Sequence, residues 1–256
     1  MLTFAPLRGL LVLLLSATAA LAQSPADLTA AGDRESAARQ PAKALPLYER
    51  AIQADPRHFA ALWKASRELV DLGEFETNVE TRTALYARAV AYAKRAVALN
   101  ENDADGHFEL ARAIGRTALA VGPRERTKYG VGVRTEAMRA LALAPRHPGA
   151  LHVMGVWNAE IMRLNGLARV VARTFLGGQI FETASWAEAT RYMELSVAIE
   201  PQRLVHRLDL ARVYRDQDRR ADARAAYAAA LAAPLTDPND EMYRRAAERE
   251  LAAIGK

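Results

Sequence analysis

The sequence predicts an all-α fold built from repeated helical hairpins. Apolar residues recur at spacings of three and four along nearly the whole chain, which is the period of one face of a helix. No segment shows the strict alternation of apolar and polar residues that is typical of a half-buried strand. A set of offsets between small residues, large residues and proline also returns several times. Together these observations predict a helical repeat array.

Residues 1–22 are typical of a secretory signal peptide. Arg8 is the one early charge, an apolar run from Leu10 to Leu15 follows, and small residues end in Ala20-Leu21-Ala22. The apolar run is much shorter than the ~20 residues that span a bilayer, so an uncleaved anchor is the weaker alternative. We expect a mature chain of residues 23–256 that forms a single domain without a transmembrane segment. It would be periplasmic or secreted, most simply in a bacterial periplasm.

The composition excludes several classes of protein. The chain has no cysteine, so disulfides, thiolate metal sites and a lipid-modified cysteine are excluded. The formal net charge is +5, from 35 basic and 30 acidic residues, and most of the basic residues are arginine. Because an alanine- and arginine-rich composition can reflect coding bias, and because an exported protein seldom meets nucleic acid, we expect no nucleic-acid partner.

The repeated element combines two small residues, a large side chain and a proline. Residues four and three apart lie on one stripe of a helix, so small residues there let a neighbouring helix approach closely. Proline cannot continue the helix and fixes the turn that follows. The clear copies are Ala44, Tyr48, Ala51, Pro56 and Ala223, Tyr227, Ala230, Pro234; the weaker ones are Ala189, Met193, Ser196, Pro201, then Ala137, Ala140, Pro145, and finally Ala89, Ala93, Ala96 without a proline.

Upstream of each copy lies a partner helix with a small residue where the two helices would cross. These residues are Gly32, Ser66, Ala111, Gly155 and Ala211. A helical hairpin of about 34 residues with this pattern is the tetratricopeptide repeat. The sequence therefore predicts a tetratricopeptide-like helical-hairpin solenoid of about five irregular repeats.

Extra residues enlarge three of the hairpins. We expect residues 73–83 and 120–132 to form loops between the paired helices, with Gly73 ending a helix and Glu74, Glu76 and Glu80 in solvent. Residues 163–185 are expected to contain an additional amphipathic helix over 167–176. This helix could pack as core, cover a groove as a lid, or contact a membrane surface. Residues 237–254 predict a final helix that caps the array.

The order of these features resembles one protein family. The segment Leu151-His152-Val153-Met154-Gly155-Val156-Trp157, the insertion after it, and the later stretches Trp186 to Ala189 and Ile199-Glu200-Pro201 are similar to the C-terminal half of the regulator of microtubule dynamics family. The stretches Leu62 to Arg67 and Ala96 to His107 look like its earlier repeats. The resemblance runs from about residue 40 to the C-terminus. It implies a tetratricopeptide-like domain without enzymatic activity that acts through partners.

The sequence also differs from the eukaryotic members of this family. Eukaryotic members are linked to microtubules and to mitochondrial or membrane locations, whereas an exported bacterial protein meets no microtubules. The chain has Gly177-Gly178-Gln179-Ile180 where those members tend towards proline-rich sequence. The resemblance therefore does not extend to a shared ligand.

Motifs for catalysis or metal binding do not occur in the sequence. The five histidines include no H-E-x-x-H pattern, and the chain has neither a cysteine nucleophile nor G-x-S-x-G. His152 is better explained as a hydrogen-bonded packing residue than as a base. We therefore predict no catalytic residue, no metal site and no cofactor.

A row of arginines with aromatic neighbours is the strongest candidate site. Three arginines directly follow the crossing residue of a first helix, two lie one turn further on, one follows the fourth first helix, and two aromatic residues lie one turn earlier. Because first helices line the inner surface of such arrays, these side chains predict a concave basic-aromatic groove. The candidate groove residues are Trp63, Arg67, Phe108, Arg112, Arg116, His152, Arg163, Arg212 and Arg215.

Three functions fit this prediction. The first is a scaffold or adaptor that binds a protein or peptide segment in the groove. The second is a carrier of a small anionic amphiphile, such as a phospholipid or fatty acid, with helix 167–176 as its lid. The third is a purely structural array in which the arginines pair internally with neighbouring carboxylates, namely Asp71, Glu109, Glu160, Asp209 and Asp216.

Overall fold

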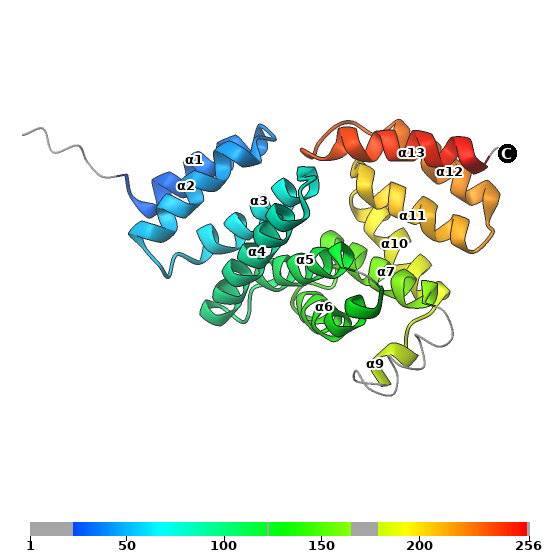
Figure 1. Ribbon diagram of the computed structural model, residues 1–256, viewed down its shortest axis with the longest axis horizontal. Helices are drawn as coiled ribbons and strands as arrows, with labels where there is room; N and C mark the ends of the chain where they lie inside the picture. Colours follow the sequence, from blue (N-terminus) through cyan, green and yellow to red (C-terminus); the bar gives the residue numbers. More distant parts are fainter. Residues whose placement is uncertain (1–22, 122, 165–178, 255–256) are drawn as a thin grey trace, which may run out of the picture.

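The computed structural model describes residues 23–121, 123–164 and 179–254, and within these ranges it is all helical without a strand (Figure 1). Residues 1–22 and 167–176, for which a signal peptide and an extra helix are predicted, lie outside the described residues. The helices are α1 (Pro25–Ala37), α2 (Pro41–Ala54), α3 (Phe59–Phe75), α4 (Val79–Leu99), α5 (Ala104–Ala120), α6 (Pro123–Leu143), α7 (Pro148–Arg163), α9 (Gln179–Glu182), α10 (Trp186–Ile199), α11 (Leu204–Asp216), α12 (Arg220–Leu231) and α13 (Asp240–Ile254).

Ten of these helices form the five predicted hairpins. The pairs are α1/α2, α3/α4, α5/α6, α7/α10 and α11/α12, and α13 packs on the last pair. The tetratricopeptide-like solenoid is therefore confirmed. The fourth pair encloses the long insertion, of which the structure describes the short helix α9. Its Phe181 stacks on Trp157 of α7, with ring centroids 6.0 Å apart.

Local sequence signals set the helix boundaries. Ser24 and Asp27 form a reciprocal capping box at the start of α1, which satisfies amide groups that a helix terminus leaves unpaired. The side chains of Asn78, Asp103 and Ser185 accept hydrogen bonds from the first turns of α4, α5 and α10 in the same way.

The predicted crossing residues lie where helices meet most closely. A Cβ atom built on Gly32 would lie 2.5 Å from Cε1 of Tyr48, and one on Gly155 would lie 2.6 Å from Cγ of Met193. Ser66, Ala111 and Ala211 are fully buried at the corresponding places. In the first and fourth hairpins, the large residue of the second helix therefore fills the space that the glycine of the first helix leaves open.

The prediction of loops at 73–83 and 120–132 is wrong. Helix α3 continues to Phe75 and α4 begins at Val79, while α6 begins at Pro123, so the added residues lengthen helices. Gly73 does not end its helix, because its missing side chain admits the ring of Tyr86: a Cβ would lie 2.3 Å from Cε1. Close packing thus outweighs the low helix propensity of glycine here.

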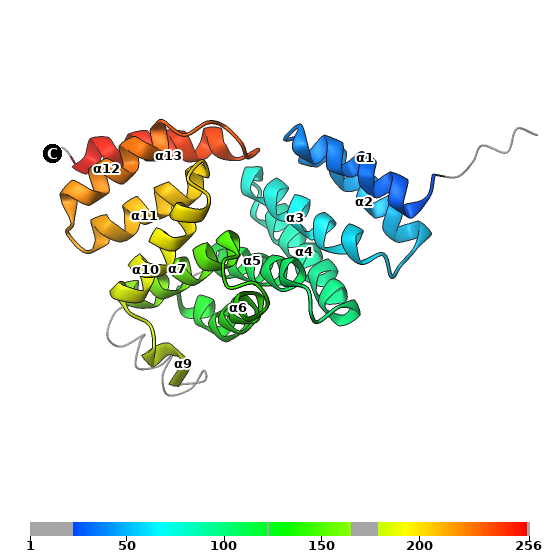
Figure 2. The same cartoon turned by 180° about the vertical axis from the view of Figure 1, so that it is seen from behind.

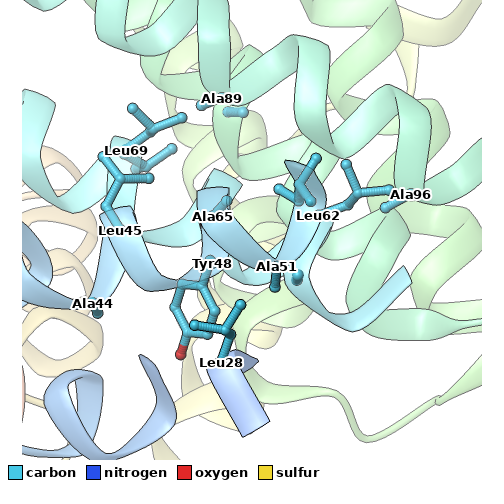
Figure 3. Packing of buried hydrophobic residues seen from close by; sticks show 14 residues of the cluster. Leu28, Ala44, Leu45, Tyr48, Ala51, Leu62, Ala65, Leu69, Ala89 and Ala96 are labelled. Atoms are coloured by element: carbon cyan, nitrogen blue, oxygen red, sulfur yellow. The ribbon is translucent and has the colours of Figure 1, made fainter. Parts of the chain in front are cut away.

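The core follows the chain as neighbouring clusters. One joins α1 to α4 around Tyr48, Leu62 and Leu69 (Figure 3). A second joins α5, α6, α7 and α9, a third lies between α7, α10 and α11, and a fourth joins α11, α12 and α13. Each hairpin buries its apolar face against its neighbours, as expected of a solenoid.

The hairpins follow a curve that brings the C-terminal end back towards the N-terminal end (Figures 1 and 2). Arg39, between α1 and α2, donates a hydrogen bond to the carbonyl of Leu235, 3.1 Å away, just before α13. In α13 the hydroxyl of Tyr243 hydrogen-bonds to Glu74 of α3. Because of these long-range contacts, the inner face of the array encloses a cavity.

Candidate functional site

A cavity of about 510 Å³ occupies the inner face of the curve. The first helices of the second to fifth hairpins, α3, α5, α7 and α11, line most of it, and α6 and the start of α13 complete it. Its apolar wall includes Val153, Val156 and Ile161 of α7 and Leu119 of α5. The volume is within the usual range for small-molecule and peptide side-chain pockets.

Seven of the nine candidate groove residues line this cavity. They are Trp63, Arg67, Phe108, Arg112, Arg116, His152 and Arg212. Arg163 and Arg215 are outside the lining. Arg163 pairs with Glu160 at 2.7 Å and Asp216 at 2.6 Å, and Arg215 pairs with Asp216 and Glu250, each at 2.9 Å. In the central hairpins, the first helices therefore direct their arginines into the cavity, as predicted. Ligand binding by these residues stays a prediction.

Every arginine that lines the cavity has a carboxylate partner. Six arginines are in this position, including Arg126 and Arg203, which the sequence pattern did not single out. Their pairs are Arg67 with Glu68 at 3.0 Å, Arg112 with Asp71, Arg116 with Glu74 at 2.8 Å, Arg126 with Glu160, Arg203 with Asp237 at 2.5 Å, and Arg212 with Glu250 at 2.6 Å. Most of these pairs link different helices, so the arginines hold the units in register.

Asp209 shows how strongly such pairing acts. Its carboxylate accepts hydrogen bonds from His152 Nε2 at 2.8 Å and from Arg212 at 2.9 Å. Burial alone would raise the pKa of Asp209, but these two partners outweigh burial and hold its pKa well below the usual range. His152 is thus hydrogen-bonded to a partner on α11, and its part in ligand binding stays a prediction.

Aromatic and imidazole rings form a second part of the lining. Phe108 and His147 lie with their ring centroids 4.6 Å apart. His152 stacks on His206 at 4.5 Å, and the Nδ1 atom of His206 lies 2.9 Å from the hydroxyl of Ser196. Burial and the neighbouring His152 hold the pKa of His206 well below its usual value. Since Ser196 is fully buried, this pair supports packing and offers no accessible nucleophile.

Several cavity residues come from the C-terminal segment and were not predicted. Arg203, Asp237 and Tyr243 line the cavity, and Glu74, which was expected in solvent, is buried against Arg116 with 4% of its side chain exposed. The prediction for Glu74 is wrong because its helix extends further than expected and because α13 covers it. Neither the added helix length nor the packing of α13 over Glu74 can be recognised from the residues next to Glu74 in the sequence.

The described residues include neither a metal-ion cluster nor a membrane-spanning helix. Within residues 23–121, 123–164 and 179–254, no cluster of three or more histidine or carboxylate side chains is arranged to hold a metal ion. In the same ranges, no helix has both the length and the apolar character needed to cross a membrane.

The pattern of hairpins and the inserted fourth unit can be compared with known proteins. The family model for regulator of microtubule dynamics protein 1-3 matches residues 26–255, nearly the whole described chain. The chain belongs to this family. Regulator of microtubule dynamics protein 1 of Mus musculus is 23% identical over 141 residues, and that of Bos taurus is 24% identical over 144 residues. These matches cover 55% of this chain but only 46% and 44% of the relatives, so the match spans less than half of those family members.

Solved structures support the fold of this family member. A thermophilic TPR protein of Thermus thermophilus aligns over 88% of this chain and 100% of its own, with a TM-score of 0.63 and 22% identity. At that identity the similarity shows the fold alone.

Proposed function

We propose that this protein is a non-enzymatic scaffold or adaptor that holds a segment of a partner protein in its concave cavity. The observation that carries the proposal is the cavity itself, which four successive first helices line along the inner face of the curve. Solenoids characteristically bind partners on such extended concave surfaces. Rings at Trp63 and Phe108 and the apolar wall of α7 provide area that a peptide can bury.

A random peptide display library panned against the full-length chain tests this proposal. Selected peptides should bind the wild type, and amide exchange should slow in α5, α7 and α11 when they bind. A Val156→Glu substitution in the wall should weaken binding, whereas Arg191→Glu on the exposed face of α10 should not. A library that yields no binder, or a binder whose protection maps to the outer face, would contradict the proposal.

A carrier of a small anionic amphiphile is the second candidate. The apolar wall formed by Leu119, Val156, Ile161 and Leu164 favours it, because an acyl chain could lie along these side chains. Helix 167–176, predicted as its lid, lies outside the described residues. The pairing of all six cavity arginines counts against an anionic head, which would have to displace existing carboxylates.

Native mass spectrometry separates the two candidates. The chain should be purified without detergent from the cells that produce it. A lipid-sized mass that stays bound to the wild type and is lost in an Arg67→Glu/Arg112→Glu variant would support the carrier. A bare chain that still binds selected peptides would support the scaffold.

We also propose that the protein is exported after cleavage behind Ala22. The support is the sequence pattern of residues 1–22, with its short apolar run and final Ala20-Leu21-Ala22. The intact mass of the native protein should correspond to a chain that begins at Gln23. A mass that retains residues 1–22, together with recovery from the cytosol, would overturn the proposal.

A further inference from the structure

Glu109 is a buried carboxylate of the cavity with one oxygen that lacks a hydrogen bond. It lies on α5, lines the cavity, and is only 2% exposed. Its Oε2 atom has no hydrogen-bond partner among the described residues, and Nη1 of Arg112 is 3.6 Å away. Burial raises the pKa of Glu109, although the positive charges of Arg112 and Arg67 oppose this. A buried carboxylate oxygen without a donor is unfavourable in an isolated protein, so it points to a donor that arrives with a ligand.

The ion pairs around the cavity disfavour an anionic ligand and leave Glu109 free to accept a hydrogen bond at Oε2. The six cavity arginines are already paired, and four of their partners, Glu68, Asp71, Glu74 and Glu250, stand behind the lining. The lining itself contributes five more carboxylates, Asp105, Glu109, Glu160, Asp209 and Asp237. The lining thus holds six arginines and five carboxylates, and each of these arginines already binds a carboxylate. An added anion must compete for arginines that are occupied, whereas a donor to Oε2 of Glu109 displaces no existing hydrogen bond of that atom.

Asp105 lies on the same face of α5 as Glu109. Asp105 lies four residues earlier, lines the cavity, and has 53% of its side chain exposed. Phe108 and Trp63 line the cavity beside these carboxylates. Aromatic faces attract ammonium and guanidinium groups and also bury the methylene stem of a long side chain.

From this arrangement we infer that the partner segment inserts a lysine or arginine side chain that donates to Glu109, with Asp105 at the mouth and Trp63 and Phe108 as walls. The inference rests on the proposed function, because it names the chemistry that the peptide must present.

The test compares peptides selected by the wild type with their binding to Glu109→Gln. Selected peptides should share a lysine or arginine at one position. Replacing that residue by norleucine should weaken binding to the wild type about tenfold or more, as expected for a lost charged hydrogen bond. The same replacement should have little effect on binding to Glu109→Gln. Glu248→Gln, an exposed position on α13, should behave like the wild type.

The possible outcomes test the inference and the scaffold proposal separately. Selected peptides without a basic position, or a norleucine replacement that weakens wild type and Glu109→Gln equally, would overturn the inference and leave the scaffold intact. A failure to select any peptide would overturn both. If Glu109→Gln does not fold, as judged by its circular dichroism, Asp105→Asn at the exposed mouth serves as the second variant and should reduce the lysine preference partially. An unchanged preference in that variant would count against the inference.

Discussion

Individual charged residues on the inner face act mainly through their partners. Asp209 receives hydrogen bonds from His152 and Arg212, so one carboxylate joins α7 to two positions within α11. Arg112 is shared between Asp71, Glu74 and Glu109 in a similar way. A buried charge that loses its partner is costly, and single substitutions at these positions should therefore be measurable as changes in stability.

Replacing Asp209 by asparagine should destabilise the fold by about 1–3 kcal/mol at pH 7, because a partly buried ion pair is broken. The folded pKa of Asp209 is lower than the unfolded value, so its contribution is complete above about pH 4 and is lost as the pH falls further. The difference in unfolding free energy between wild type and variant should thus shrink below about pH 4, as measured by urea denaturation across pH.

The matched control is Asp222→Asn. Asp222 pairs with Arg219 at 2.7 Å, but half of its side chain is exposed. An exposed pair contributes about 0–1 kcal/mol, so this variant should stay close to the wild type. An equal effect of both substitutions would show that burial does not decide the strength of these pairs.

At the scale of helices, three of the hairpins have a close crossing at a glycine. Gly32 faces Tyr48, Gly73 faces Tyr86, and Gly155 faces Met193. The glycines admit a large side chain from the second helix, and this contact sets how closely the two helices approach. The repeat is therefore a packing unit as well as a sequence pattern.

Gly73→Ala should lower the stability by about 1–3 kcal/mol, since its Cβ would lie 2.3 Å from the ring of Tyr86. Gly132→Ala in α6 is the control, because the nearest atom to its Cβ is Cδ1 of Ile114 at 3.6 Å. There alanine should be neutral or stabilise by up to about 1 kcal/mol through helix propensity. Melting temperatures of the two variants should therefore shift in opposite directions or differ clearly.

The turn between α11 and α12 contains a residue in the left-handed backbone conformation. Asp218, between α11 and α12, has a φ angle of 57°, a left-handed conformation that costs a residue with a Cβ atom more than it costs glycine. Its side chain is 82% exposed. Asp218→Gly should therefore raise the unfolding free energy by about 0.5–1 kcal/mol in spite of the loss of its contact with Arg220. A lower melting temperature would show that this contact matters more than the backbone conformation.

Across the whole molecule, contacts between the two ends complete the cavity. Tyr243 of α13 hydrogen-bonds to Glu74 and receives a hydrogen bond from Arg116 at 3.0 Å. The carbonyl of Asp71 accepts a hydrogen bond from Asn239 at 3.5 Å. Without these contacts the array would be an open curve of hairpins, and α13 would cap only the last of them.

Tyr243→Phe combined with Arg39→Ala should loosen this closure, because both removed groups bond across the two ends. Amide exchange in residues 235–243 should become faster, while exchange within the α7/α10 pair stays unchanged. Tyr192→Phe is the control, since its hydroxyl contacts the sulfur of Met138 at 3.8 Å, within the neighbouring hairpins. Unchanged exchange at 235–243 in the double variant would show that apolar packing of α13 alone keeps the ends together.

The sequence by itself determined the repeat and the helices. The offsets of alanine, tyrosine or methionine, and proline predicted five hairpins because each helix carries its own periodic stripe and its own terminal signals. It also placed Trp63, Arg67, Phe108 and Arg112 on the inner face, because helical spacing fixes which side of a helix a residue occupies. These properties are local.

Tertiary structure decided what surrounds those residues. Glu74 is buried, Arg203 and Tyr243 line the cavity, and every cavity arginine is already paired, because the array curves until residues far apart in sequence meet. The curve is the sum of small packing angles between successive hairpins, and no short stretch of sequence records that sum. For the same reason, the missing hydrogen bond at Oε2 of Glu109 became visible only in the tertiary structure, where Arg112 lies closer to Asp71 than to Glu109.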